Sequence, residues 1–172
     1  MKSVQTMVDA HERMIERLMT KYGDSVARVC FLFLKDRQLA QDAAQETFIK
    51  AWKALDSLKQ EGAEKAWLMK IAVNTCKNVL RSRYFKMVDR GVSTENLPEP
   101  ATEDRQEDDS LLKEVLRLPD KYRQAVVLYY YQELSAEETG AALGIPAATV
   151  RTRLKRAREL LKTRLKEWYF DE

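Results

Sequence analysis

The residues best suited to chemistry are five cations crowded into the eight positions from 151 to 158. Like charges repel one another, so this density is typical of a surface that binds a polyanion. Arginine and lysine donate hydrogen bonds to phosphate oxygens and to the edge of guanine. The pattern therefore predicts a nucleic-acid contact, and the alternative is a charged face that meets only water. The cations are Arg151, Arg153, Lys155, Arg156 and Arg158.

These cations lie on a predicted amphipathic helix over residues 147–166. At about 100° per residue, one face of this helix is a narrow apolar stripe. The stripe consists of Val150, Leu154, Ala157, Leu161 and Leu165. The opposite face has Thr152, Lys155, Arg156 and Glu159 at its centre, Arg151, Arg158 and Lys162 along one rim, and Arg153 on the other.

The residues before this helix predict a second, shorter helix and a tight turn. Ser135 and Glu138 have the spacing of a capping box, which begins a helix that reaches about Leu143. Gly144 is placed to end that helix, and Ile145–Pro146 to begin the next one. A helix, a glycine turn and a basic amphipathic helix together indicate a helix-turn-helix, whose second helix enters the DNA major groove.

The composition argues against catalysis and against a bound cofactor or metal. The chain has one histidine, His11, and two cysteines, Cys30 and Cys76, with no metal-ligand spacing. No paired carboxylates lie within apolar segments, so we expect no enzyme. Both cysteines lie in apolar runs and are expected to be buried free thiols. Because the first residues lack the apolar core of a signal peptide, a cytoplasmic protein is expected.

The chain as a whole predicts an all-α fold with two small domains. Among its 172 residues only 5 are Gly and 4 are Pro, and apolar residues recur at helical spacing. Residues 1–88 carry a net charge of +6 and residues 89–110 a net charge of −6. We predict domains over residues 1–88 and 111–172, joined by a flexible acidic linker at 89–110. Helices are expected over residues 4–34, 37–55, 67–80, 111–118, 122–134, 135–143 and 147–166.

A second candidate surface lies on the helix predicted over residues 37–55. Asp42, Gln45, Glu46 and Ile49 are spaced i, i+3, i+4 and i+7, so they share one face, which Trp52 and Lys53 border. This face could dock a helical partner, or it could be ordinary solvent-exposed surface.

Three motifs in the right order make the chain resemble a bacterial sigma factor of the sigma-70 family, extracytoplasmic-function (ECF) class. These motifs are DAAQETFIKAW, then AWLMKIAVNTCKN, and finally an LP-helix segment with a helix-turn-helix that ends in VRTRLKRAREL. The resemblance runs from about Val4 to about Leu165, and it implies a promoter-specificity subunit with sigma domains two and four.

The resemblance also implies roles for individual residues. Asp42, Gln45 and Glu46 would dock on a coiled coil of the β′ subunit of RNA polymerase. The segment 67–83 would open the −10 promoter element, and the loop at 59–65 would capture a flipped base. Residues expected at the −10 element are Lys59, Gln60, Glu61, Asn74, Lys77 and Arg81. Those expected at the −35 element are Arg151, Thr152, Lys155, Arg156 and Arg158.

Structural roles remain open for several of these features. Asn74 could be a helix-surface amide, Trp67 is expected to pack in the core, and the acidic linker either follows the RNA path in the polymerase or is a plain tether.

The partners implied by the resemblance are core RNA polymerase (its β′ coiled coil and β subunit), promoter DNA and an anti-sigma factor that could be membrane-anchored. The DNA would be duplex at −35 and single-stranded at −10. An ordinary two-domain regulator is the rival hypothesis, and it predicts tight binding of the free protein to a palindromic duplex. An adaptor that only binds polymerase would leave the basic helix unexplained.

Overall fold

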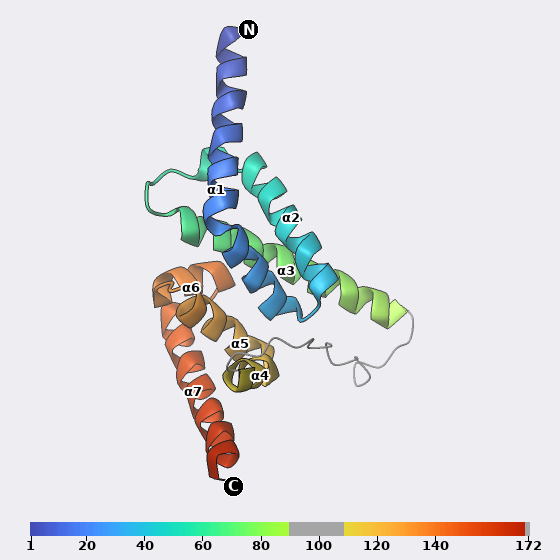
Figure 1. Cartoon of the computed structure of the whole chain (residues 1–172), viewed down its shortest axis with the longest axis vertical. Helices are drawn as coiled ribbons and strands as arrows, with labels where there is room; N and C mark the ends of the chain where they lie inside the picture. The colour runs from blue at the N-terminus through green and yellow to red at the C-terminus, as the bar shows by residue number, and fades with distance from the viewer. Residues whose placement is uncertain (90–108, 171–172) are drawn as a thin grey trace. The chain divides into compact units, whose positions relative to one another are not determined.

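The computed structural model describes residues 1–89 and 109–170, and within them every regular element is helical, which confirms the all-α prediction. The chain divides into two compact units, Met1–Arg81 and Ser82–Glu172. Figure 1 shows the helices of each unit. The acidic segment predicted to be a linker lies almost entirely outside the described residues.

The N-terminal unit is built on a pair of helices packed side by side, α1 (Lys2–Leu34) and α2 (Arg37–Lys53) (Figure 1). The turn between them is the predicted break. Lys35 takes up a left-handed conformation, with φ of 54°, and Asp36 caps α2 by accepting a hydrogen bond of 2.9 Å from the Leu39 amide. The buried residues of α2 include the alanines Ala40, Ala43 and Ala51, whose small side chains let α1 approach closely.

A 3₁₀ turn, η1 (Leu55–Ser57), and a short loop lead into α3 (Glu64–Asp89), which is longer than the helix expected over residues 67–80. The apolar residues of α3 predicted its buried face but not its polar ends, where periodicity carries no signal. The buried side chains are Leu68, Met69, Ala72, Val73 and Cys76. Cys30 and Cys76 are both buried free thiols, as the sequence predicted.

The C-terminal unit consists of α4 (Asp109–Arg117), α5 (Asp120–Val126), the π-helical turn η3 (Val127–Tyr131), α6 (Ala136–Leu143) and α7 (Ala147–Phe170). Its core joins α4, α5 and α7 and consists mainly of Val115, Leu118, Ala125, Val126, Val150, Leu154 and Ala157. The helix expected over residues 122–134 ends earlier, because Glu133 has a φ of 56° and turns the chain toward α6. Leu134 is nonetheless buried, as its apolar character suggested.

A buried arginine fixes the turn between α4 and α5. Arg123 is only 2% exposed, and its guanidinium donates to the Leu118 carbonyl at 2.9 Å and to Asp120 Oδ1 at 2.6 Å. A charge removed from water must be paired and hydrogen-bonded, and these two acceptors meet part of that need. Pro119, the N-cap of α5, lies between these two acceptors in the sequence, so the turn and the buried charge form one unit.

The start of α6 and the turn from α6 to α7 have the local contacts that the sequence predicted. Ser135 Oγ accepts from the Glu138 amide, and the Glu138 carboxylate accepts from the Ser135 amide, each at 3.0 Å. Gly144 ends α6 with a φ of 72°, a left-handed conformation that glycine adopts without steric cost. Gly140 packs directly against the backbone of the turn, since a Cβ at that position would lie 2.5 Å from the Ile145 carbonyl oxygen.

Candidate functional site

The basic helix α7 presents the predicted polar face to solvent. Val150, Leu154 and Ala157 are buried against α4 and α5, which fixes the rotation of the helix about its axis. The five residues predicted to contact the −35 element are consequently all exposed. They are Arg151, Thr152, Lys155, Arg156 and Arg158. Arg153, on the opposite rim, is half-buried.

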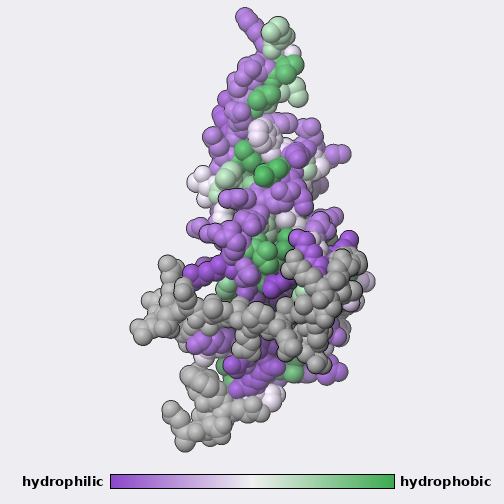
Figure 2. All heavy atoms as spheres, turned by 90° about the vertical axis from the view of Figure 1, so that its right-hand side faces the viewer, coloured by the Kyte–Doolittle hydropathy of each residue, from purple (hydrophilic) through white to green (hydrophobic). Residues whose placement is uncertain are grey.

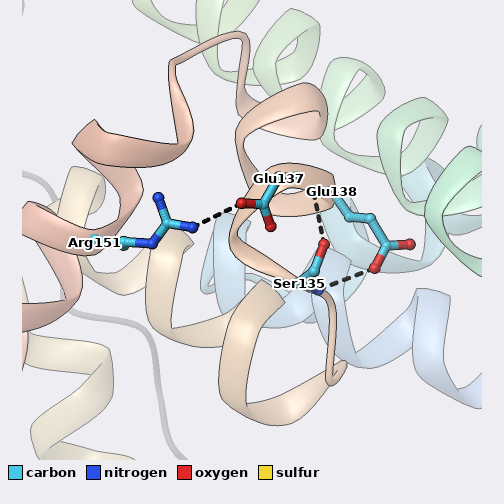
Figure 3. Close-up of polar contacts among 4 residues, drawn as sticks. All are labelled: Ser135, Glu137, Glu138 and Arg151. Carbon is cyan, nitrogen blue, oxygen red and sulfur yellow. Dashed lines mark hydrogen bonds and ion pairs between the residues drawn. The ribbon is translucent and has the colours of Figure 1, made fainter.

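An ion pair links this face to the first helix of the helix-turn-helix. Arg151 Nη2 lies 2.7 Å from Glu137 Oε1, next to the capping box that begins α6 (Figure 3). The pKa of Glu137 is lowered, first by a hydrogen bond from its own backbone amide and then by the hydrogen bond from Arg151. The ion pair therefore holds the Arg151 side chain toward the N-terminal end of α6. The exposed face of α7 remains accessible to a ligand.

Two further contacts orient the other cations of α7. Arg158 Nη1 donates a hydrogen bond of 2.9 Å to the hydroxyl of Tyr130, in the π-helical turn. Arg156 Nη1 donates one of 3.2 Å to Glu159, one turn along the same helix. A partly neutralised, oriented row of guanidinium groups suits phosphate oxygens and guanine edges.

The acidic face of α2 is also solvent-exposed. Asp42, Gln45 and Glu46 are exposed, and Asp42 Oδ1 accepts a hydrogen bond of 3.2 Å from Gln38. Beside them the large apolar side chains of Ile49 and Trp52 are each 47% exposed. A patch that combines carboxylates with exposed apolar side chains on one helix has the composition of a protein-docking surface.

The third group of predicted residues divides between a loop and the exposed face of α3. Lys59, Gln60 and Glu61 are exposed in the loop between η1 and α3, where Gly62 has a φ of 89°. Lys70, Asn74, Lys77 and Arg81 follow one another at helical spacing on α3. All are exposed except Lys77, which is half-buried, while Val73, Thr75 and Cys76 face the core. This arrangement gives α3 a polar, cationic track.

Trp67 has a role at the base of this loop. It is only partly buried, and its Nε1 donates a hydrogen bond of 3.0 Å to Ser57 Oγ. The expectation that Trp67 packs in the core is thus met only in part.

Sequence reasoning missed Glu137 and Tyr130, the partners of Arg151 and Arg158. Each pair joins residues 14 or 28 positions apart. No local pattern links such residues, so only the packed arrangement reveals them. Glu137 neighbours the capping-box Glu138 in the sequence, but a single glutamate in the first turn of a helix is too common to signal a contact.

The described residues contain no group of three or more His, Cys, Asp or Glu side chains that could hold a metal ion. None of the helices in that part of the chain is both long and apolar enough to cross a membrane.

Comparison with known families gives two matches. Residues 18–85 match Sigma-70 region 2, and residues 108–161 match Sigma-70, region 4. The first match covers α2, the following loop and most of α3, and the second covers the helix-turn-helix.

Curated relatives match over most of the chain. The ECF RNA polymerase sigma factor SigW of Bacillus subtilis is 34% identical, over 85% of this chain and 86% of that protein. The RNA polymerase sigma-H factor of Pseudomonas aeruginosa is 31% identical, over 92% and 89%.

Solved structures share the fold. The sigma factor RpoE from Bartonella quintana, determined with the anti-sigma factor NepR, has a TM-score of 0.74 and 26% identity, covering 91% of this chain and 98% of that one. CnrH, determined with the cytosolic domain of CnrY, is 22% identical with a TM-score of 0.63, covering 90% and 89%, which supports the fold alone.

Proposed function

Because the chain belongs to the ECF class of the sigma-70 family, whose members are transcription initiation factors rather than enzymes, we propose specific surfaces for its contacts with core RNA polymerase and two promoter elements. The observation that carries this proposal is that the exposed faces of α3 and α7 are cationic, whereas the exposed face of α2 combines acidic with apolar side chains. Each surface suits a different partner.

The exposed face of α7 reads the −35 element as duplex DNA. Thr152, Lys155 and Arg156 lie at the centre of this face and contact base edges. Arg151 and Arg158 lie at its rim, where they bind phosphates, and the tethers to Glu137 and Tyr130 restrict them to one side of the helix.

The loop and the exposed face of α3 bind the −10 element as an unpaired strand. Lys59, Gln60 and Glu61 form the loop that accepts a flipped base. Asn74, Lys77 and Arg81 follow the strand along the helix. Holding an unpaired strand takes a cationic groove for its backbone and a pocket for each extruded base.

The face of α2 with Asp42, Gln45 and Glu46 docks on the β′ coiled coil of core polymerase. The carboxylates provide charge complementarity, and the exposed Ile49 and Trp52 beside them provide apolar area. One polymerase then holds both DNA-binding surfaces. The second contact becomes intramolecular, so two weak interactions become selective together.

Control by an anti-sigma factor in the cytoplasm completes the proposal, and its release would connect transcription to a stress signal. The support is the likeness to RpoE of Bartonella quintana, whose structure was determined together with an anti-sigma factor. A membrane-anchored inhibitor would place the complex at the membrane surface.

Run-off transcription from a promoter library, with purified core polymerase, tests this function. We expect specific transcripts that require the protein and that fall strongly with the double variant Gln45→Ala, Glu46→Ala. The start sites give the −35 and −10 preferences. If no transcript depends on the protein, yet the free protein alone shifts a palindromic duplex, the polymerase-directed function is wrong and an ordinary regulator replaces it.

A further inference from the structure

We propose that the N-terminal half of α1 holds the −10 loop in its base-selecting shape, so that Arg17 and His11 are positioning residues for promoter selectivity. This inference rests on the proposed function of the loop at residues 58–63. Neither residue belongs to the predicted DNA contacts. Both precede residue 18, where the match to Sigma-70 region 2 begins.

The first tie fixes the end of the loop. Arg17 Nη2 lies 2.7 Å from Oε1 of Glu64, which is the first residue of α3. The Glu64 side chain is only 15% exposed, and its carboxylate stands at a helix N-terminus, where negative charge is favoured. A short, partly buried ion pair of this kind restricts where α3 begins, and hence where the loop must arrive.

A second, weaker contact with α1 lies at the beginning of the loop. His11 Nε2 lies 3.5 Å from Oδ1 of Asp56, in the 3₁₀ turn that leads into the loop. Arg17 and His11 are six residues apart on one helix, and Asp56 and Glu64 flank the loop. Side chains of one helix, α1, therefore contact both flanks of the loop.

The base of the loop is closed independently of α1. Trp67 Nε1 donates to Ser57 Oγ at 3.0 Å, and Ser57 Oγ donates to the Ala54 carbonyl at 2.6 Å. A hydrogen bond of 3.3 Å from the Ala63 amide to the Gln60 carbonyl tightens the loop itself. With its ends held, the tip presents Lys59, Gln60 and Glu61 to solvent.

Selection among bases requires a rigid tip, because a loop that can shift accommodates several bases. In both contacts one partner, Arg17 or Asp56, is exposed to water, and ion pairs that water screens in this way contribute little to the overall stability of a fold. The ties to α1 should therefore affect which base the loop accepts much more than whether the domain folds. A loss of base selectivity without a loss of folding stability therefore distinguishes a positioning role from a general structural one.

The experiment uses the full chain in complex with core polymerase and fork-junction promoter DNA randomised across the single-stranded −10 positions. The readout is selectivity, the ratio of affinities for the preferred base and for the other three. For Arg17→Ala we expect selectivity to fall by about three- to tenfold. Affinity for a −35 duplex and for core polymerase should stay as in the native protein.

Two further variants serve as controls. Arg17→Lys keeps a cation near Glu64 and should recover most of the selectivity. Arg13→Ala removes an exposed arginine one turn earlier on the same helix and should leave selectivity at the native value. Arg17→Ala could also lower the melting temperature. In that case, a return of base selectivity in Arg17→Lys without a full return of the melting temperature supports the positioning role.

A loop variant, Gln60→Ala, separates this inference from the function of the loop. Native selectivity in Arg17→Ala together with altered selectivity in Gln60→Ala overturns the role of α1 and leaves the loop assignment standing. Native selectivity in both variants overturns the loop assignment, and the role of α1 with it.

Discussion

The guanidinium of Arg158, on the recognition helix, donates a hydrogen bond of 2.9 Å to the hydroxyl of Tyr130, in the π-helical turn of the same unit. Tyr130 is itself half exposed, and its ring meets that of Tyr129 edge to face, with centroids 5.0 Å apart. The π-helical turn thus supplies a fixed acceptor that aims a flexible side chain along the edge of the DNA-binding face.

This contact predicts the effect of removing a single oxygen atom. Tyr130→Phe keeps the ring but removes the acceptor for Arg158, so the arginine must be ordered by the DNA itself. We expect affinity for a −35 duplex to fall by about two- to fivefold. Fluorescence anisotropy with labelled duplex measures this. Tyr22→Phe, in the other unit, is the matched control, and an unchanged affinity in Tyr130→Phe would contradict the orienting role.

The centre and the rim of α7 should respond differently to truncation. Arg156→Ala should cost about 1–3 kcal/mol of discrimination at one base pair and relax specificity there. Arg158→Ala should weaken binding to duplexes of every sequence alike. It should also reduce the slope of log affinity against log salt concentration by about one. Titrations of a mutated duplex series at several salt concentrations separate the two. The assignment is wrong if both variants change only the salt slope.

The exposed apolar patch on α2 predicts a variant that weakens polymerase binding without harming the fold. Ile49→Ala removes a side chain that is 47% exposed, so the free energy of unfolding should change by less than about 0.5 kcal/mol. Binding to core polymerase should weaken by about 1–2 kcal/mol, since buried apolar contacts concentrate interface energy. Competition binding measures it. Met19→Ala, at a similarly exposed apolar position on α1, should bind as the native chain does.

The close approach at the helix-turn-helix predicts a destabilising glycine substitution. In Gly140→Ala the new Cβ would meet the Ile145 carbonyl oxygen, a backbone atom that cannot rotate away. Overpacking of this kind costs about 1–3 kcal/mol, which exceeds the roughly 1 kcal/mol that alanine gains over glycine within a helix. Hydrogen exchange of the amides in α6 and α7 should therefore become faster.

Gly23→Ala provides the comparison for this prediction. A Cβ at Gly23 meets nothing within 4 Å, so the helix preference of alanine acts alone. That variant should slow exchange in α1 by an amount equal to about 0.5–1 kcal/mol. Unchanged or slower exchange in Gly140→Ala would mean that the turn relaxes around the new methyl group.

The buried thiols predict how stability depends on pH. The hydrogen bond between Cys76 and Cys30, together with burial, raises the pKa of Cys76. The unfolded chain loses the thiol proton above about pH 8.5, whereas the folded chain keeps it, so folding stability declines as pH rises through that range. Denaturant titrations from about pH 7 to 10 should give a steeper decline for the native protein than for Cys76→Ala. The same pH dependence of folding stability in both proteins would contradict the raised pKa of Cys76.

How much of this could be predicted from the sequence depends on the range of each interaction. The capping box at Ser135, the turn at Gly144 and the first half of the apolar stripe of α7 are local patterns, so the sequence predicted them and the structure confirms them. Leu161 and Leu165, in the second half of that stripe, are only half-buried. Burial of both cysteines was likewise predictable from their apolar neighbours.

Contacts between distant segments were not predictable. The thiols of Cys30 and Cys76 meet across 46 positions, and the ties from α1 to Asp56 and Glu64 span more than 40. Charged residues are frequent on every helix of this chain, so nothing in the sequence distinguishes those that pair from those that meet water. The roles of the candidate site residues stay predictions.

The enclosed Arg123 has a consequence for how the C-terminal unit folds. Its guanidinium leaves water most readily when the Leu118 carbonyl and the Asp120 carboxylate are both in place to accept its hydrogen bonds. A partly folded unit, with α5 packed but the turn before it unformed, would lose two hydrogen-bond acceptors of a charge buried in an apolar core. This loss raises the free energy of such intermediates. The turn and the core should therefore appear in a single cooperative step.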